Sequence, residues 1–142
     1  MLSLTPFLLF EGDCAEAMAF YRSCLGGDLT VVRVGDTPMK DQRPAELHGL
    51  VAYARLVSAA VVLSATDWQH QARRPRQGNT VGLYLTGETA EEMRPVFDRL
   101  SAGGDPELLD PLVDMPFGLY GHFADRFGVH WFFRGEPHAG SA

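Results

Sequence analysis

The strongest constraint in this chain of 142 residues is an imperfect internal repeat. Phe20 is followed by the triplet Gly-Gly-Asp at 26–28, and Phe97 is followed by the same triplet at 103–105. Both features recur after 77 residues (97 − 20). Two copies are too few for a solenoid, which needs at least about three repeats to bury a continuous core. The repeat therefore predicts one domain built from two similar modules.

Each copy is preceded by a pattern that is typical of a helix start. Asp13 is followed three residues later by Glu16, and Thr89 is followed in the same way by Glu92. In such a capping box the first side chain accepts a hydrogen bond from the helix backbone, and the glutamate bonds back to an amide at the helix start. We therefore expect Asp13 and Thr89 to be the N-caps of two helices.

The pattern of apolar residues predicts the order β-α-β-β-β in each half. In the first half, the expected strand, helix and three strands span residues 5–10, 13–25, 29–34, 50–57 and 60–66. In the second half they span residues 80–86, 90–102, 108–113, 120–124 and 129–134. Pro95 falls inside the second helix, where a proline removes a hydrogen bond and clashes with the preceding turn. We expect a kink or a late helix start there.

These elements predict the α+β class and a single domain that spans residues 1–142. Its two modules are expected at about 4–67 and 79–134, separated by a polar linker at 68–78. The tail at 135–142 combines glycine, proline and serine, and we expect it to be disordered.

The charge and hydropathy of the chain argue against two classes of partner. The net charge is −6 and the basic cluster at 73–76 is short, whereas nucleic-acid binding requires an extended basic face. No apolar run approaches the roughly 18 residues of a membrane span. We therefore expect no nucleic-acid partner, no membrane partner and a cytoplasmic location.

Both cysteines, Cys14 and Cys24, fall on the first expected helix. A rise of about 1.5 Å per residue places them about 15 Å apart, which is beyond the reach of a disulfide. We expect both to be buried thiols. The position of Cys14 at a helix N-terminus leaves a reactive thiolate as the alternative.

Alternation within a strand of the first half separates two faces. Ala52, Ala54 and Leu56 are small and apolar and suit packing beneath a helix. Tyr53 and Arg55 point to the opposite face. A sheet covered by helices on one side, with aromatic and polar residues on the other, indicates a cupped ligand surface.

Several short motifs carry a resemblance to a known superfamily. The segment 19–27 contains Ala-Phe-Tyr followed by Leu-Gly-Gly, and the segment 125–131 reads Asp-Arg-Phe-Gly-Val-His-Trp. The segments 6–12 and 120–121 fit the same pattern. Over residues 5–133 the chain resembles the vicinal oxygen chelate superfamily, which includes glyoxalases, extradiol dioxygenases and bleomycin- and fosfomycin-resistance proteins. The motifs are those of its PhnB-like branch.

This resemblance implies a fold and two partners. Members of the superfamily arrange two βαβββ modules into a cupped mixed sheet, with the helices on its outer face. They are commonly homodimers, and several hold a small organic molecule in the cup. A second copy of the chain and a small-molecule ligand are therefore the expected partners.

The resemblance also implies a divalent metal held by His and Glu side chains, and this chain departs from that pattern. Pro6 occupies the position of the first-strand ligand, and Phe132 occupies that of the closing glutamate. Tyr53 stands where the PhnB-like branch often has a histidine. Neither 61–66 nor 80–85 contains His, Asp, Glu or Cys, and a catalytic site needs about three such ligands. We expect no cofactor; a divalent metal such as zinc, held by relocated histidines, is the alternative.

The candidate ligand-binding residues are polar and aromatic groups expected to line the cup. Alternation places His130 and Phe132 on one face of the closing strand, with Trp131 and Phe133 packed beneath the helix. The orientation of His122 does not follow from the sequence. The full candidate set is Tyr53, Arg55, Trp68, Tyr120, His122, His130 and Phe132.

Four functions are compatible with these residues. A metal-free cup that binds a small organic molecule is favoured. A metal-dependent lyase, isomerase or dioxygenase would draw its ligands from His48, His122 and His130. A metal-free enzyme would use a histidine as general base, with Arg55 stabilising an oxyanion. A structural or regulatory dimer without a ligand is the fourth function, and the sequence leaves open both catalysis and the identity of a ligand.

Overall fold

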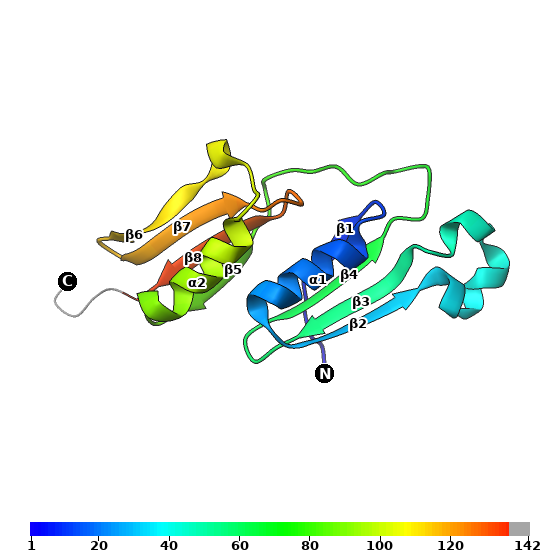
Figure 1. Ribbon diagram of the computed structural model, residues 1–142, viewed down its shortest axis with the longest axis horizontal. Coiled ribbons are helices and arrows are strands. Elements are labelled where there is room, and N and C mark those ends of the chain that lie inside the picture. Colours follow the sequence, from blue (N-terminus) through cyan, green and yellow to red (C-terminus); the bar gives the residue numbers. More distant parts are fainter. Residues whose placement is uncertain (137–142) are drawn as a thin grey trace. The chain divides into compact units, whose positions relative to one another are not determined.

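The computed structural model describes residues 1–136. The chain divides into two compact units, a first module of Met1–Arg76 and a second module that begins at Gln77. Each follows the order β-α-β-β-β, so the α+β class and the two βαβββ modules are confirmed (Figure 1). None of the helices that residues 1–136 form is long and apolar enough to span a membrane.

The first module is a four-stranded sheet with one helix across a face (Figure 1). Its elements are β1 (Phe7–Phe10), α1 (Cys14–Leu25), β2 (Asp28–Arg33), β3 (Val51–Val57) and β4 (Val62–Asp67). The strand order is β1-β4-β3-β2; β1 pairs in parallel with β4, and the other neighbours are antiparallel. Ala17, Met18 and Tyr21 of α1 are fully buried against this sheet.

The second module repeats this plan. Its elements are β5 (Leu83–Gly87), α2 (Ala90–Ser101), a 3-10 helix (Pro106–Leu108), β6 (Asp110–Met115), β7 (Gly118–Ala124) and β8 (His130–Gly135). The strand order is β5-β8-β7-β6, with β5 parallel to β8. Phe97 of α2 packs edge-on against Phe123 and Phe133, with ring centroids 5.0 and 5.1 Å away. Gly121 leaves room for this ring, since a Cβ there would lie 2.6 Å from Phe97.

The repeated glycines have the same structural role in both modules. Gly27 follows α1 and Gly104 follows α2, and a Cβ on either would collide with a carbonyl oxygen at the end of a strand. That oxygen belongs to Val57 of β3 in the first case and to Ala124 of β7 in the second. β3 and β7 are the third strands of their modules in chain order. The repeated glycines therefore allow the same contact in both modules, in which the end of the helix lies close to the end of the third strand.

The two helices begin by different means. Thr89 caps α2 as predicted, and its Oγ1 accepts a hydrogen bond from the amide three residues on, at 3.1 Å. Asp13 occupies the N-cap position of α1 as predicted, but its side chain makes no cap hydrogen bond, so that part of the prediction was wrong. The Asp67 carboxylate at the end of β4 accepts the amides of Gly12 and Cys14 instead, at 2.8 and 3.0 Å. The buried carboxylate of Asp67, which the sheet positions, thus replaces the side-chain cap expected from Asp13.

Several boundaries differ from the predicted ones. α2 starts where expected and continues through Pro95, so the alternative of a late start was wrong. The strand expected at 108–113 begins at Asp110, because a 3-10 turn precedes it. β8 extends to Gly135, one residue into the expected tail. Residues 137–142 of that tail lie outside the described part of the chain.

A β-bulge changes the face of one residue in β3. Tyr53 and Val51 pair with consecutive residues of β2, which leaves Ala52 as the extra residue between them. Val51 is fully buried and Ala52 is half-buried. Val51, rather than Ala52, therefore joins Ala54 and Leu56 in the buried set, which corrects the prediction for Ala52.

Candidate functional site

Strands β7 and β8 place four of the candidate residues on one face of the second sheet. His122 and Phe132 are direct cross-strand partners, and Tyr120 and His130 occupy alternate positions on the same two strands. The β8 side chains between them are buried, and β8 packs against α2. The predicted alternation of β8, with His130 and Phe132 on one face and Trp131 and Phe133 on the other, is confirmed. Because His122 pairs with Phe132, its side chain lies on the face of His130 and Phe132.

Two imidazoles and a carboxylate form a cluster on this face. His122 Nε2 lies 3.1 Å from His130 Nδ1, within hydrogen-bonding distance. Asp110 Oδ2, from β6, lies 3.8 Å from the other ring nitrogen of His122, Nδ1. The ring of Phe132 stacks on His122 with 4.2 Å between centroids. Gly82 leaves space for that ring, because a Cβ there would lie 2.5 Å from it.

The surroundings of His122 favour its neutral form. Burial lowers the pKa of His122 from its usual value of 6.5, and the neighbouring His130 lowers it further. Asp110 acts in the opposite direction, because a carboxylate favours the cation. At neutral pH His122 therefore carries one N–H and one bare ring nitrogen.

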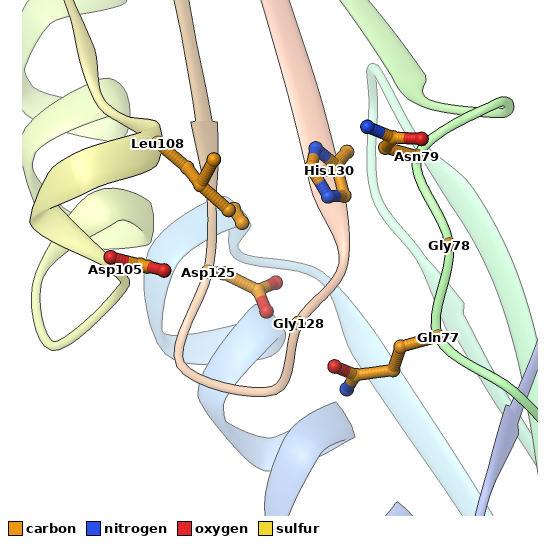
Figure 2. Close-up of a pocket in the computed structure, with 9 residues that line it drawn as sticks. Gln77, Gly78, Asn79, Asp105, Leu108, Asp125, Gly128 and His130 are labelled. Atoms are coloured by element: carbon orange, nitrogen blue, oxygen red, sulfur yellow. The ribbon is translucent and has the colours of Figure 1, made fainter.

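An open pocket of about 400 Å³ lies where His130 begins β8 (Figure 2). The side chains that line it include Gln77, Asn79, Asp105, Leu108, Asp125 and His130. They supply carboxylates, amides, an imidazole and an apolar wall, and no lysine or arginine is among the described lining residues. His130 belongs both to the imidazole cluster and to this pocket.

The turn after β7 shapes one wall of the pocket. Asp125 Oδ1 accepts the amides of Phe127 and Val129 at 2.8 and 3.0 Å, and its Oδ2 accepts the indole N–H of Trp131 at 2.9 Å. Gly128 closes the turn with a φ of +84°, a conformation that favours glycine. The Asp-Arg-Phe-Gly motif is thus a structural device that also bounds the pocket.

Sequence reasoning missed much of this lining. Gln77 lies in the segment expected as a linker, and Asn79 lies just after that segment. The side-chain amide of Gln77 donates a hydrogen bond to the Phe127 carbonyl at 2.8 Å. No periodic pattern marks these positions. Asp105 carried a usable signal, since it ends the repeated Gly-Gly-Asp triplet; its Oδ1 accepts the Glu107 amide at 3.0 Å and begins the 3-10 helix.

The other three candidate residues lie in the first module. Tyr53 and Arg55 are exposed on one face of β3. Trp68 follows β4, where its indole N–H donates to the Ala72 carbonyl at 3.1 Å and its ring packs edge-on against His70. Trp68 also lines a smaller pocket of about 190 Å³.

Two other candidate groups have structural explanations. His48 Nε2 lies 2.9 and 3.0 Å from the carbonyl oxygens of Lys40 and Arg43, which fixes the loop before β3. Cys14 is buried, and burial together with the nearby Asp67 carboxylate raises the pKa of its thiol to about 12. The alternative of a reactive Cys14 was wrong, because a thiolate at this position would be desolvated and would lie close to the negative charge of Asp67.

The described residues do not fit the divalent metal that the resemblance implies. Within residues 1–136, no group of three or more His, Cys, Asp or Glu side chains is placed to hold a metal ion. The inherited positions hold Pro6 and Phe132, which offer no ligating atom. His122 Nε2 and His130 Nδ1 face each other, while Asp110 lies beside the opposite nitrogen of His122. These three groups therefore do not converge on one point.

Comparison with known proteins identifies the family. A model of the Glyoxalase/Bleomycin resistance protein/Dioxygenase superfamily matches residues 3–133. Protein YjdN of Escherichia coli K12 is 30% identical over 139 residues, covering 92% of each chain. The structure of PA1353 from Pseudomonas aeruginosa matches with a TM-score of 0.82 and 31% identity, over 96% of this chain and 99% of that one. The PhnB protein of Bacillus cereus matches with a TM-score of 0.72 and 28% identity, over 94% and 99%. The chain therefore belongs to the Glyoxalase/Bleomycin resistance protein/Dioxygenase superfamily, in its PhnB-like branch.

Proposed function

We propose that this protein binds a small organic molecule in the pocket of the second module, without a metal at the superfamily's usual positions. The observation that carries the proposal is the double position of His130, which lines the pocket and joins the imidazole cluster. Through His130, a ligand in the pocket would meet a face that also presents Phe132 and Tyr120.

The size and lining of the pocket suit a small ligand. Its volume of about 400 Å³ lies in the range of roughly 300–1,000 Å³ that is usual for small-molecule sites. Leu108 offers an apolar wall, and the amides of Gln77 and Asn79 offer hydrogen bonds that fix orientation. A compact molecule with one flat or apolar part and a few polar groups matches this arrangement.

A second copy of the chain is the proposed protein partner. Large apolar side chains are exposed on strands of both sheets, among them Phe7 at 53%, Leu9 at 42% and Tyr84 at 63%. Phe7 and Leu9 alternate on β1 and so share one face, and contiguous exposed apolar surface is typical of interaction sites. Sedimentation equilibrium of the native protein, compared with Phe7→Asp and Tyr84→Asp variants, tests this; a monomer at micromolar concentration contradicts it.

The ligand proposal is tested with purified full-length protein. Elemental analysis is expected to find no stoichiometric divalent metal. Fragment probes (phenol, benzylamine and benzoate) are then added to ¹⁵N-labelled protein, and backbone shifts are expected at Asn79 and Gly128. His130→Ala should abolish these shifts. His70→Ala, an exposed histidine in the first module, is the matched control and should leave them unchanged.

Two results would overturn this proposal. Stoichiometric metal that is lost in His130→Ala would replace it with metal-dependent chemistry. Shifts that map to the Trp68 pocket, or that persist in His130→Ala, would place the ligand elsewhere.

A further inference from the structure

The hydrogen bond between His122 and His130 leaves each ring with one further nitrogen. A neutral imidazole carries a single N–H, so one ring donates in this bond and the other accepts. Two arrangements are possible. If His122 Nε2 donates, His130 keeps its proton on Nε2; if His130 Nδ1 donates, His130 Nε2 is bare.

Asp110 selects between these arrangements. Its carboxylate lies 3.8 Å from His122 Nδ1, and a negative charge there favours a proton on that nitrogen. With Nδ1 protonated, a neutral His122 has a bare Nε2, which must accept the bond. His130 Nδ1 is then the donor, and His130 Nε2 carries a free lone pair.

His130 Nε2 is the ring nitrogen that the histidine pair leaves unbonded. Nδ1 is engaged with His122, and Nε2 forms no hydrogen bond with any group of residues 1–136. Figure 2 shows the His130 ring among the lining side chains, on the strand opposite Asn79 and Gly78. The imidazole that borders the pocket therefore keeps one unprotonated nitrogen, and its tautomer is set by groups that do not line the pocket.

We propose that His130 is a general base in this pocket and that His122 and Asp110 are the positioning residues that hold it in the accepting tautomer. The substrate class is a small organic molecule with a weakly acidic O–H or C–H bond. Its proton passes to His130 Nε2 and the bonding electrons remain on the substrate. Return of the proton to the same or a neighbouring atom restores the neutral ring, so no co-reactant is needed. This proposal rests on the ligand site proposed above.

Carboxylates lie around the pair that accepts this proton. On protonation, His130 keeps its Nδ1–H bonded to His122 Nε2, and Asp110 faces His122 from β6. Asp105 and Asp125 line the same pocket as His130. Phe132, the cross-strand partner on β8, adds no charge. Fixed negative groups that are already in place stabilise a developing positive charge without reorganisation.

The tautomers can be measured without any ligand. In ¹⁵N spectra of the histidine side chains at pH 8, His122 and His130 are each expected as the Nδ1–H tautomer. Asp110→Asn should convert a measurable fraction of both to the Nε2–H form. Asp114→Asn, an exposed carboxylate on the same strand, is the matched control. Finding His130 as the Nε2–H form in the native protein overturns the proposal.

Reactivity gives an independent readout. Diethyl pyrocarbonate acylates unprotonated imidazole nitrogen, and peptide mapping resolves each histidine. His130 is expected to react faster than exposed His70. His122→Phe, which keeps the stack on Phe132, should slow acylation of His130 by about fivefold, the effect of losing one hydrogen bond. Asp110→Asn should slow it by about threefold, as expected for an exposed charge.

Unchanged acylation of His130 in both variants, with native-like spectra, contradicts the positioning roles. These tests are independent of ligand binding. If the fragment probes fail to bind but the tautomers and acylation rates behave as stated, the ligand site is wrong, whereas the positioning of His130 by His122 and Asp110 stands.

Discussion

The two modules bury an aspartate in different ways. Asp67 accepts the amides of Gly12, Cys14 and Val51, which lie 55, 53 and 16 residues away in sequence. Asp125 accepts three N–H groups that lie only two, four and six residues further along the chain. The first carboxylate joins separate elements, and the second holds one turn and its strand. A repeated topology therefore does not require a repeated hydrogen-bond network.

The sheet faces that do not pack against a helix differ as well. β3 presents Tyr53 and Arg55 in the first module, and β7 and β8 present His122, His130 and Phe132 in the second. Only the second face, among the described residues, holds titratable rings in hydrogen-bonding contact. The two modules therefore share a scaffold, whereas the hydrogen-bonded pair of imidazoles belongs to the second module.

Removal of the buried carboxylates tests the first contrast most strongly. Asp67→Ala is expected to lower the free energy of unfolding by about 4 kcal/mol, because three amides lose their acceptor inside the protein. Asp125→Ala should cost about 2 kcal/mol, since a local turn can relax and find water. Urea unfolding measures both, and hydrogen exchange assigns each loss to a module. Equal losses would contradict the contrast.

Alanine at the repeated glycines tests what the modules share. Gly27→Ala should cost about 3 kcal/mol, because it combines a collision with Val57 and a φ of +101°. Gly104→Ala should cost about 2 kcal/mol from its collision with Ala124 alone. Gly26→Ala is the control, with a φ of +74° but open space around the new Cβ, and should cost about 1 kcal/mol. A Gly104→Ala protein as stable as the wild type would show that the close approach can relax.

The helix starts give a smaller contrast. Thr89→Ala should lower the free energy of unfolding by about 1 kcal/mol, because α2 loses its side-chain cap. Asp13→Ala should change it by less than about 0.5 kcal/mol, since Asp13 makes no cap hydrogen bond. Urea unfolding of the two variants side by side provides the measurement. A larger loss at Asp13 would mean that Asp67 does not replace the local cap.

The smallest expected effect is a pH dependence confined to the second module. Because the folded pKa of His122 is lowered, the unfolded chain binds a proton more readily than the folded protein. This contribution to stability is complete above pH 6.5 and is lost as the pH falls through the folded pKa. The melting temperature of His122→Phe should therefore fall less steeply with acid than that of the wild type. A parallel fall in both proteins would show that His122 is not the titrating group.

Local patterns predicted the fold well and the site in part. The capping box at Thr89, the alternation on β8 and the Gly-Gly-Asp triplets all correspond to contacts within one or two neighbouring elements. The Asp13 cap failed because a distant carboxylate competes for the same amides. The bulge at Ala52 left no signal, since it depends on the pairing of two strands.

The candidate site shows the same division. His122, His130 and Phe132 could be selected from residue type and strand position, whereas Asp110, Gln77 and Asn79 could not. Asp110 reaches His122 only because β6 pairs with β7. Gln77 and Asn79 line the pocket only because the chain before β5 passes the turn after β7.

The sequence alone determined the repeat and the βαβββ order, which follow from residue type and from periodicity over a few positions. Its resemblance to the superfamily implied in addition that Pro6 and Phe132 stand at the positions of metal ligands. Only the tertiary structure decided that two histidines share a hydrogen bond beside a carboxylate and that one of them, His130, lines a pocket. Such contacts depend on strand register and turn course, and those are set by the packing of the whole module.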